Sequence, residues 1–235
     1  MKLLQKIGKI IVYSCILFSA VAGVLYFCYH TPIPKGKQGA KADALAHKML
    51  QALHATALEN TTTLEWSFSG GNHHYYWDRT KSIVTISWKD NIASLHLYSP
   101  KKNTVTTGDV EIYGTKKKKL LKKAVSYFNN DSFWLLAPFK VFDKGTERSI
   151  VILENGEEAL LVTYTNGGTT PGDSYLWKLN ADGLPNSFQM WVKIIPIGGL
   201  EASWNNWKIM NTGLLLPTEH KIGPFTINMG EVKAL

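Results

Sequence analysis

The chain has few cysteines, and this shortage limits what the protein can be. Its only cysteines, Cys15 and Cys28, lie inside an apolar N-terminal stretch, so the rest of the chain has none with which to form a disulfide. A small fold stapled by disulfides is therefore excluded. The remainder, Thr31 to Leu235, is long enough for one domain to bury a sufficient core without cross-links, and no second linker divides it.

The chain also lacks the sequence motifs of common enzymes. It has no Gly-x-Ser-x-Gly elbow, no glycine-rich phosphate loop and no His-Glu-x-x-His. His73 and His74 are adjacent, so on a strand they point to opposite faces and cannot both ligate one metal ion. Asp173, Ser174 and His220 would form a hydrolytic triad only if the fold brought them together, and nothing local supports this. We predict no catalytic residue, no metal site and no cofactor.

The formal net charge of +8 suggests nucleic-acid binding until the charges are located on the chain. Three of these charges are lysines that precede the apolar stretch, and six more are lysines that form one later run. The rest of the chain therefore has a net charge of −1. No basic stripe interleaved with aromatic residues extends beyond that run, so we predict no nucleic-acid partner. The run consists of Lys116, Lys117, Lys118, Lys119, Lys122 and Lys123.

This lysine run has helical periodicity. Leu120, Leu121, Ala124, Val125 and Phe128 fall on one face of a helix, and the lysines occupy its other faces. One interpretation is a surface helix with a solvated basic face. The other is a membrane-surface element in which each lysine contributes about 1 kcal/mol of attraction to anionic lipid headgroups.

The apolar N-terminal stretch predicts a membrane span. Ile10 to Tyr29 contains no charged residue, and about 20 apolar residues suffice to cross roughly 30 Å of hydrocarbon as a helix. Lys2, Lys6 and Lys9 on its short side favour a cytoplasmic N-terminus. We expect an N-terminal signal anchor at residues 1–30, a Pro/Gly linker at residues 31–40, and one domain at residues 41–235 in the periplasm.

A cleaved signal peptide is the alternative to this anchor. Ala20, Val21 and Ala22 fit the small-x-small pattern of a cleavage site, which would release the protein into the periplasm after Ala22. The apolar run continues past that point to Phe27, which favours a retained single-pass anchor in the inner membrane. A lipid attachment site is not expected, because bulky residues precede Cys28.

Alternation of apolar and polar residues predicts that strands dominate the domain. A first helix is expected from Ala42 to Leu58, and a meander of strands begins at Leu64. Later strands are expected from Ser149 to the end of the chain, joined by turns such as Asn166-Gly167-Gly168. The fold class is therefore mostly β with two helices (α+β): a single curled antiparallel sheet forming a half-open barrel with a helical lid, preceded by the transmembrane helix.

Large apolar side chains lie at inward positions of several predicted strands and of the segment after the lysine helix. Each buried aromatic ring removes some 150 to 250 Å² from water, whether it packs in a plain core or lines a cavity. Pockets for apolar ligands are lined mainly by such groups. We predict that the lining of a ligand-binding cavity includes Trp66, Phe68, Trp88, Trp134, Leu136, Trp177 and Trp191.

Three segments carry a resemblance to a known family: Phe128 to Asp143, Thr170 to Trp177, and Ile194 to Glu201. Over Lys41 to Leu235 the chain resembles periplasmic proteins of the lipoprotein-carrier fold, the LolA/LolB-like superfamily. It is most similar to uncharacterised envelope proteins of Bacteroidota-type bacteria within that group. The resemblance implies a half-open barrel that holds lipid acyl chains under helices and performs no chemistry.

Two features depart from the carriers of that superfamily. They are soluble after signal cleavage, whereas we expect this chain to retain its span. The only arginines here, Arg79 and Arg148, match no lid-holding motif. We expect non-catalytic binding of a lipid or other apolar ligand at the outer side of the inner membrane. The alternatives are a structural or interaction module with a self-filled barrel and an unidentified envelope protein partner, and, as the weakest, an unrecognised hydrolase.

Overall fold

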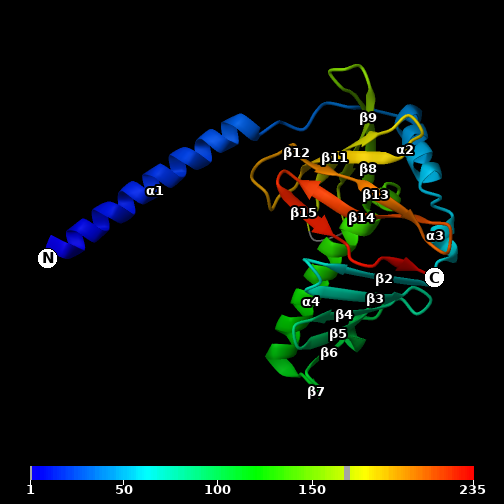
Figure 1. The fold of residues 1–235 in the computed structure, drawn as a ribbon, viewed down its shortest axis with the longest axis horizontal. Coiled ribbons are helices and arrows are strands. Elements are labelled where there is room, and N and C mark those ends of the chain that lie inside the picture. Colours follow the sequence, from blue (N-terminus) through cyan, green and yellow to red (C-terminus); the bar gives the residue numbers. More distant parts are fainter. Residues whose placement is uncertain (1, 167–169) are drawn as a thin grey trace.

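Apart from a long N-terminal helix, the chain is built mainly of short antiparallel strands (Figure 1). This computed structural model describes residues 2–166 and 170–235. The predicted turn at Gly167 and Gly168 lies outside the described residues. The helices are α1 (Lys2–Tyr29), α2 (Ala40–Ala52), α3 (Ala57–Asn60) and α4 (Gly114–Leu136), with short 3-10 helices at η1 (Pro100–Lys102) and η2 (Ala137–Lys140).

The strands form three antiparallel sheets. The six-stranded sheet A has the order β1-β8-β9-β10-β11-β12, with β1 (Lys37–Gln38), β8 (Thr146–Ile152), β9 (Glu158–Tyr164), β10 (Ser174–Leu179), β11 (Pro185–Trp191) and β12 (Leu200–Ser203). The seven-stranded sheet B has the order β16-β2-β3-β4-β5-β6-β7, with β2 (Thr63–Phe68), β3 (His73–Asp78), β4 (Ile83–Trp88), β5 (Asn91–His96), β6 (Thr104–Thr107), β7 (Val110–Glu111) and β16 (Lys233–Ala234). The three-stranded sheet C contains β13 (Asn205–Ile209), β14 (Leu215–Ile222) and β15 (Phe225–Asn228).

The mostly β, α+β class is confirmed, but the single sheet curled into a half-open barrel is wrong, because three sheets are present and they do not close into a barrel. The ladder breaks where the chain leaves extended conformation. The chain passes from sheet A to sheet C at Trp204, between β12 and β13, and Asn206 within β13 has a positive φ of 54°. Strand β15 ends at Asn228, shortly before Gly230, which has a positive φ of 66°.

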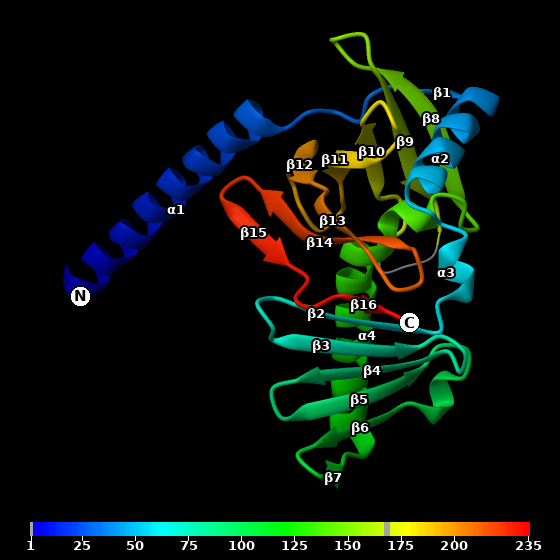
Figure 2. The same ribbon diagram turned by 45° about the vertical axis from the view of Figure 1, so that its right-hand side comes forward.

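Helix α4 is the central element of the domain. Its first half lies against sheet B and its second half reaches toward β14 and the strands of sheet A (Figures 1 and 2). At 1.5 Å per residue its 23 residues extend about 35 Å. The sequence predicted the lysine-rich part of this helix, but the helix continues through Asp131 and Ser132, which are polar and buried. One hydrophobic core therefore runs along α4 and is shared by all three sheets.

Helix α1 projects away from the rest of the molecule (Figure 1). Lys6–Tyr29 is long and apolar enough to cross a membrane, and the same length and composition suit a signal sequence. The segment that follows, predicted as a linker, makes contacts with the domain. In it β1 pairs with β8, with Lys37 opposite Ile150 and Gln38 opposite Ser149.

Candidate functional site

The predicted ligand-binding residues of sheet B face α4. Trp66 and Trp88 are buried and Phe68 is partly buried, all on the face of β2 and β4 that the helix covers. The Trp66 ring stacks on Tyr75 with 4.5 Å between ring centroids, and Phe128 of α4 lies edge-on to Trp77 at 5.3 Å. We call this group the lower aromatic cluster: Trp66, Tyr75, Trp77 and Phe128.

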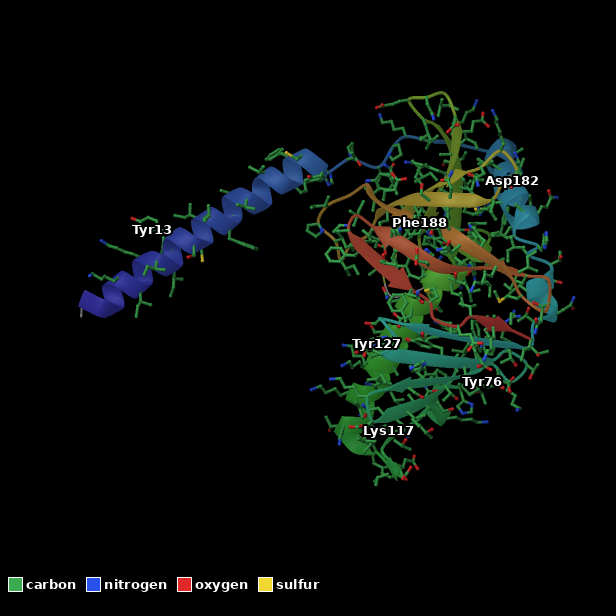
Figure 3. The ribbon with its side chains drawn as sticks, in the orientation of Figure 1. Tyr13, Tyr76, Lys117, Tyr127, Asp182 and Phe188 are labelled. Atoms are coloured by element: carbon green, nitrogen blue, oxygen red, sulfur yellow. The ribbon has the colours of Figure 1, made fainter. Side chains whose placement is uncertain are left out.

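The second half of α4 carries Trp134 and Leu136 into another group of rings. Trp134 lies 5.6 Å from Phe188 and 6.5 Å from Trp204, and Trp177 packs edge-on against Phe188 at 5.0 Å (centroid distances). Figure 3 labels Phe188 at the centre of this region. We call this group the upper aromatic cluster: Trp134, Trp177, Phe188 and Trp204. Six of the seven predicted residues thus belong to one core around α4.

The seventh, Trp191, lies on the opposite face of sheet A. It belongs to a separate small cluster with Val151, Leu161 and Leu176. Phe188 and Trp191 are three residues apart on β11, and an odd separation puts side chains on opposite faces of a strand. This alternation is the signal in the sequence that separates Trp191 from the interior group.

The core around α4 is filled by side chains. Trp177, Phe188 and Trp204 are fully buried, and Trp134 is only 9% exposed. Trp66, Phe68 and Trp88 pack on the side of sheet B that α4 covers, and Trp134 and Leu136 lie on α4 itself. The role of these residues as the lining of a ligand-binding cavity stays a prediction.

Some polar atoms within this core make no hydrogen bond in the described structure: the indole N–H groups of Trp66, Trp77, Trp177 and Trp204, and Nε2 of His220. His220 is fully buried, and its Nδ1 lies 3.0 Å from the carbonyl oxygen of Ser203. Burial lowers the pKa of His220 to about 4, although the backbone carbonyl groups of Ser203 and Trp134 act in the opposite direction. The ring is therefore neutral at pH 7.

A buried carboxylate ties α4 to sheet B. Asp131 accepts a hydrogen bond from His73 Nδ1 at 2.7 Å and another from the Tyr75 hydroxyl, and its second oxygen accepts one from Asn130 Nδ2 at 2.8 Å. The His73 ring also packs on Tyr127 of α4, 3.9 Å between centroids. Burial and, secondarily, Asp131 raise the pKa of Tyr75 above its ordinary value, so its hydroxyl remains a donor. No local pattern predicts this contact, because 58 residues separate His73 from Asp131.

The hydrolytic residues considered above do not form a triad. Asp173 accepts hydrogen bonds from the Lys193 backbone and the Thr170 hydroxyl, and Ser174 pairs with Thr163 at 2.8 Å. His220 contacts Ser203, as described above. Within residues 2–166 and 170–235, no group of three or more His, Cys, Asp or Glu side chains is arranged to hold a metal ion.

The face of sheet B that is turned away from α4 is polar. A shallow hollow of about 400 Å³ lies on it, over β2, β3, β4 and the C-terminal strand. Tyr76, labelled in Figure 3, is 46% exposed there. Charged side chains of both signs and several hydroxyl groups line the hollow. These polar lining residues are Glu65, Ser67, His74, Thr85, Ser87, Glu231 and Lys233.

The predicted membrane-surface lysines lie on the first half of α4. Lys117 is partly buried and the other five are exposed. Lys117 lies over the Tyr113 ring at 6.0 Å and Lys123 over the Tyr127 ring at 5.3 Å. Figure 3 labels Lys117 near the start of α4 and Tyr127 further along the helix. The basic face is thus available to an anionic surface.

Comparison with solved structures finds a DUF1329 family protein from Desulfovibrio piger, 10% identical to this chain with a TM-score of 0.41. The match covers 82% of this chain and 92% of that protein. No protein-family model and no curated protein matches the chain. The resemblance to the lipoprotein-carrier fold stays a prediction.

Proposed function

We propose that the protein is a non-catalytic interaction module of the cell envelope, held by α1 at the outer side of the inner membrane, with an interior filled by its own side chains. The observation that carries this proposal is the position of α4. Its apolar face fills the space between the sheets, so a partner would bind on the outside of the domain.

The energy of α4 burial supports this choice over lipid uptake. Four large apolar side chains of α4 are buried: Phe128, Trp134, Leu135 and Leu136. At about 1.5 to 3 kcal/mol each, exposing them would cost about 6 to 12 kcal/mol. An acyl chain leaving a bilayer is already in hydrocarbon and gains almost nothing by entering a protein core. Uptake from the membrane would therefore leave most of this cost unmet.

The polar hollow on sheet B is our candidate contact surface for a protein partner. An antiparallel sheet with one covered face and one open face is stable without a partner, so the hollow is not required for folding. Glu65 and Lys233 lie opposite each other on the paired strands β2 and β16, and both line the hollow. Exposed Tyr76 beside them resembles the amphipathic aromatic anchors that are enriched at protein interfaces.

Binding of a lipid or other apolar ligand inside the domain is the second candidate, and a specific observation favours it. Four buried indole N–H groups without partners line the two aromatic clusters. A buried donor without an acceptor lowers the stability of the core, and a ligand with a polar group would restore that stability by accepting the hydrogen bond. An acyl chain of 16 CH₂ groups taken from water would gain about 13 kcal/mol, enough to offset movement of α4. This ligand would have to arrive from water and not from the bilayer.

Native mass spectrometry of the segment Thr31–Leu235 purified from cells separates the two candidates. The segment begins at Thr31 because the linker hydrogen-bonds to the domain. We expect the mass of the chain alone. A defined lipid mass would support the second candidate, provided that its occupancy rises in Asp131→Asn, which weakens the contact between α4 and β3. Lipid occupancy unchanged by that variant would indicate attachment at the outer surface.

A further inference from the structure

The end of the anchor is hydrogen-bonded to a loop of the domain. The Thr31 N–H donates to the Gly198 carbonyl oxygen at 2.9 Å, and the Gly198 N–H donates to His30 Nδ1 at 3.0 Å. The Trp191 indole N–H donates to the Thr31 carbonyl oxygen at 2.7 Å. We call these four residues, His30, Thr31, Trp191 and Gly198, the anchor clasp.

The clasp is continuous with the helix on one side. His30 donates its backbone N–H to Tyr26 at 2.8 Å, and the two rings stack with 4.4 Å between centroids. Two glycines make the close approach on the other side possible. A Cβ at Gly198 would meet Trp191 Cδ1 at 2.4 Å, and a Cβ at Gly199 would meet Thr31 Oγ1 at 1.7 Å. The clasp thus leaves almost no free chain between the helix and the domain.

The loop next to the clasp is rich in isoleucine; Ile194 at its tip is exposed, whereas Ile195 and Ile197 are partly buried. It runs from Lys193 to Ile197 between β11 and β12, on the side of the domain next to the end of α1 (Figure 1). Ile194 is 73% exposed, and Ile33 of the linker is 47% exposed. Lys193 and Lys35 are exposed cations beside these isoleucines. Isoleucine flanked by lysine suits the border between hydrocarbon and anionic headgroups.

The length of the anchor fixes where this loop lies. The 24 residues from Lys6 to Tyr29 extend about 36 Å as a helix, somewhat more than the hydrocarbon thickness of about 30 Å. Tyr29 therefore reaches the outer headgroup region, which is about 5 to 8 Å thick. His30 and Thr31 follow directly, and they are hydrogen-bonded to Trp191 and Gly198, which flank the loop. We propose that the loop Lys193–Ile197 inserts into the outer-leaflet headgroup region as a second membrane contact, held there by the anchor clasp.

This inference depends on the retained anchor of the proposed function and adds a fixed orientation of the domain on the bilayer. Its test uses the full chain with Cys15→Ser and Cys28→Ser, so that one new cysteine can carry an environment-sensitive fluorophore. Ile194→Cys places the probe on the loop. Ile209→Cys is the matched control, because Ile209 is similarly exposed (71%) and pairs with Leu215, beside Leu53 at the far end of α2.

Each labelled chain is reconstituted in vesicles of phosphatidylethanolamine and phosphatidylglycerol, with and without a lipid that carries a quencher near its headgroup. We expect blue-shifted, quenched emission for the probe at Ile194 and unshifted, unquenched emission for the probe at Ile209. Equal quenching at the two sites, or none at Ile194, would overturn the proposal. A chain that fails to float with the vesicles at all would instead overturn the retained anchor.

A second arm tests the clasp itself. Gly199→Ala brings a Cβ against Thr31, whereas Gly156→Ala, at a glycine of nearly equal φ (84° against 82°), meets nothing within 4 Å. Both variants carry the probe at Ile194. Quenching should be lost in Gly199→Ala and kept in Gly156→Ala. Quenching that persists in Gly199→Ala, with linker residues Lys35 and Lys37 newly cut by trypsin, would mean that the clasp does not hold the loop in the membrane.

Discussion

Replacing Trp134 with alanine tests directly whether α4 fills the interior. The indole ring is 9% exposed and packs between Phe188, Trp204 and His220. Because these neighbours belong to a fully buried core, they can collapse only partly into the space left by the ring. We expect a loss of about 3 to 5 kcal/mol in the free energy of unfolding, as for other buried tryptophan truncations.

Urea unfolding followed by far-ultraviolet circular dichroism measures this loss, since the substitution also changes tryptophan emission. Tyr98→Ala is the control, because Tyr98 is 88% exposed and its loss should cost less than about 0.5 kcal/mol. Added indole should raise the melting temperature of Trp134→Ala by occupying the cavity, and should not change that of the wild type. A loss below about 1 kcal/mol, or wild-type stabilisation by indole, would refute the packed interior.

Three further predictions concern the buried polar groups and the lysines. Asp131→Ala leaves His73 and Tyr75 without their acceptor and should lower the free energy of unfolding in urea by about 3 to 5 kcal/mol, whereas Asp109→Ala on the exposed β6–β7 turn should lower it by almost nothing. Equal losses in the two variants would show that the buried contact is unimportant. His220 becomes protonated below about pH 6.5 in the unfolded chain but only below about pH 4 in the folded chain, so the free energy of unfolding should fall by on the order of 3 kcal/mol as the pH drops through that window. The His220→Gln variant should lack this pH-dependent fall, and an identical pH profile in the variant would contradict the assignment to His220. Changing the five exposed lysines of α4 to glutamine should weaken the binding of Thr31–Leu235 to anionic vesicles, measured by co-sedimentation, by about 1 kcal/mol per lysine. This loss should exceed that of the control variant Lys101→Gln with Lys102→Gln, and an equal loss in the two variants would mean that the α4 lysines are only a solvated face.

Local patterns in the sequence were sufficient to predict the meander of sheet B. Leu64, Trp66 and Phe68 alternate with polar residues, and Gly70 and Gly71 both adopt the positive φ that their turn requires. The short strands β6 and β7 were not predicted. Only Val105 is buried among their residues, so a stretch rich in threonine gives almost no apolar alternation.

Contacts between distant segments explain what the sequence could not predict. The polar run from Asn129 to Ser132 reads as the end of a helix, yet α4 continues because Asp131 finds partners on β3. Sheet A gives way to sheet C at Trp204, between β12 and β13, and β15 ends at Asn228, shortly before Gly230 with its positive φ of 66°. The docking of Thr31 against Gly198 joins residues 167 positions apart, and no local pattern marks it.

Native mass spectrometry of Thr31–Leu235 tests the central claim most directly, because it measures whether the interior holds anything besides the protein. If α4 fills the space between the sheets, the purified segment should show the mass of its own chain and no defined lipid. A stoichiometric lipid adduct that increases in Asp131→Asn would contradict the account and identify the protein as an acyl-chain binder.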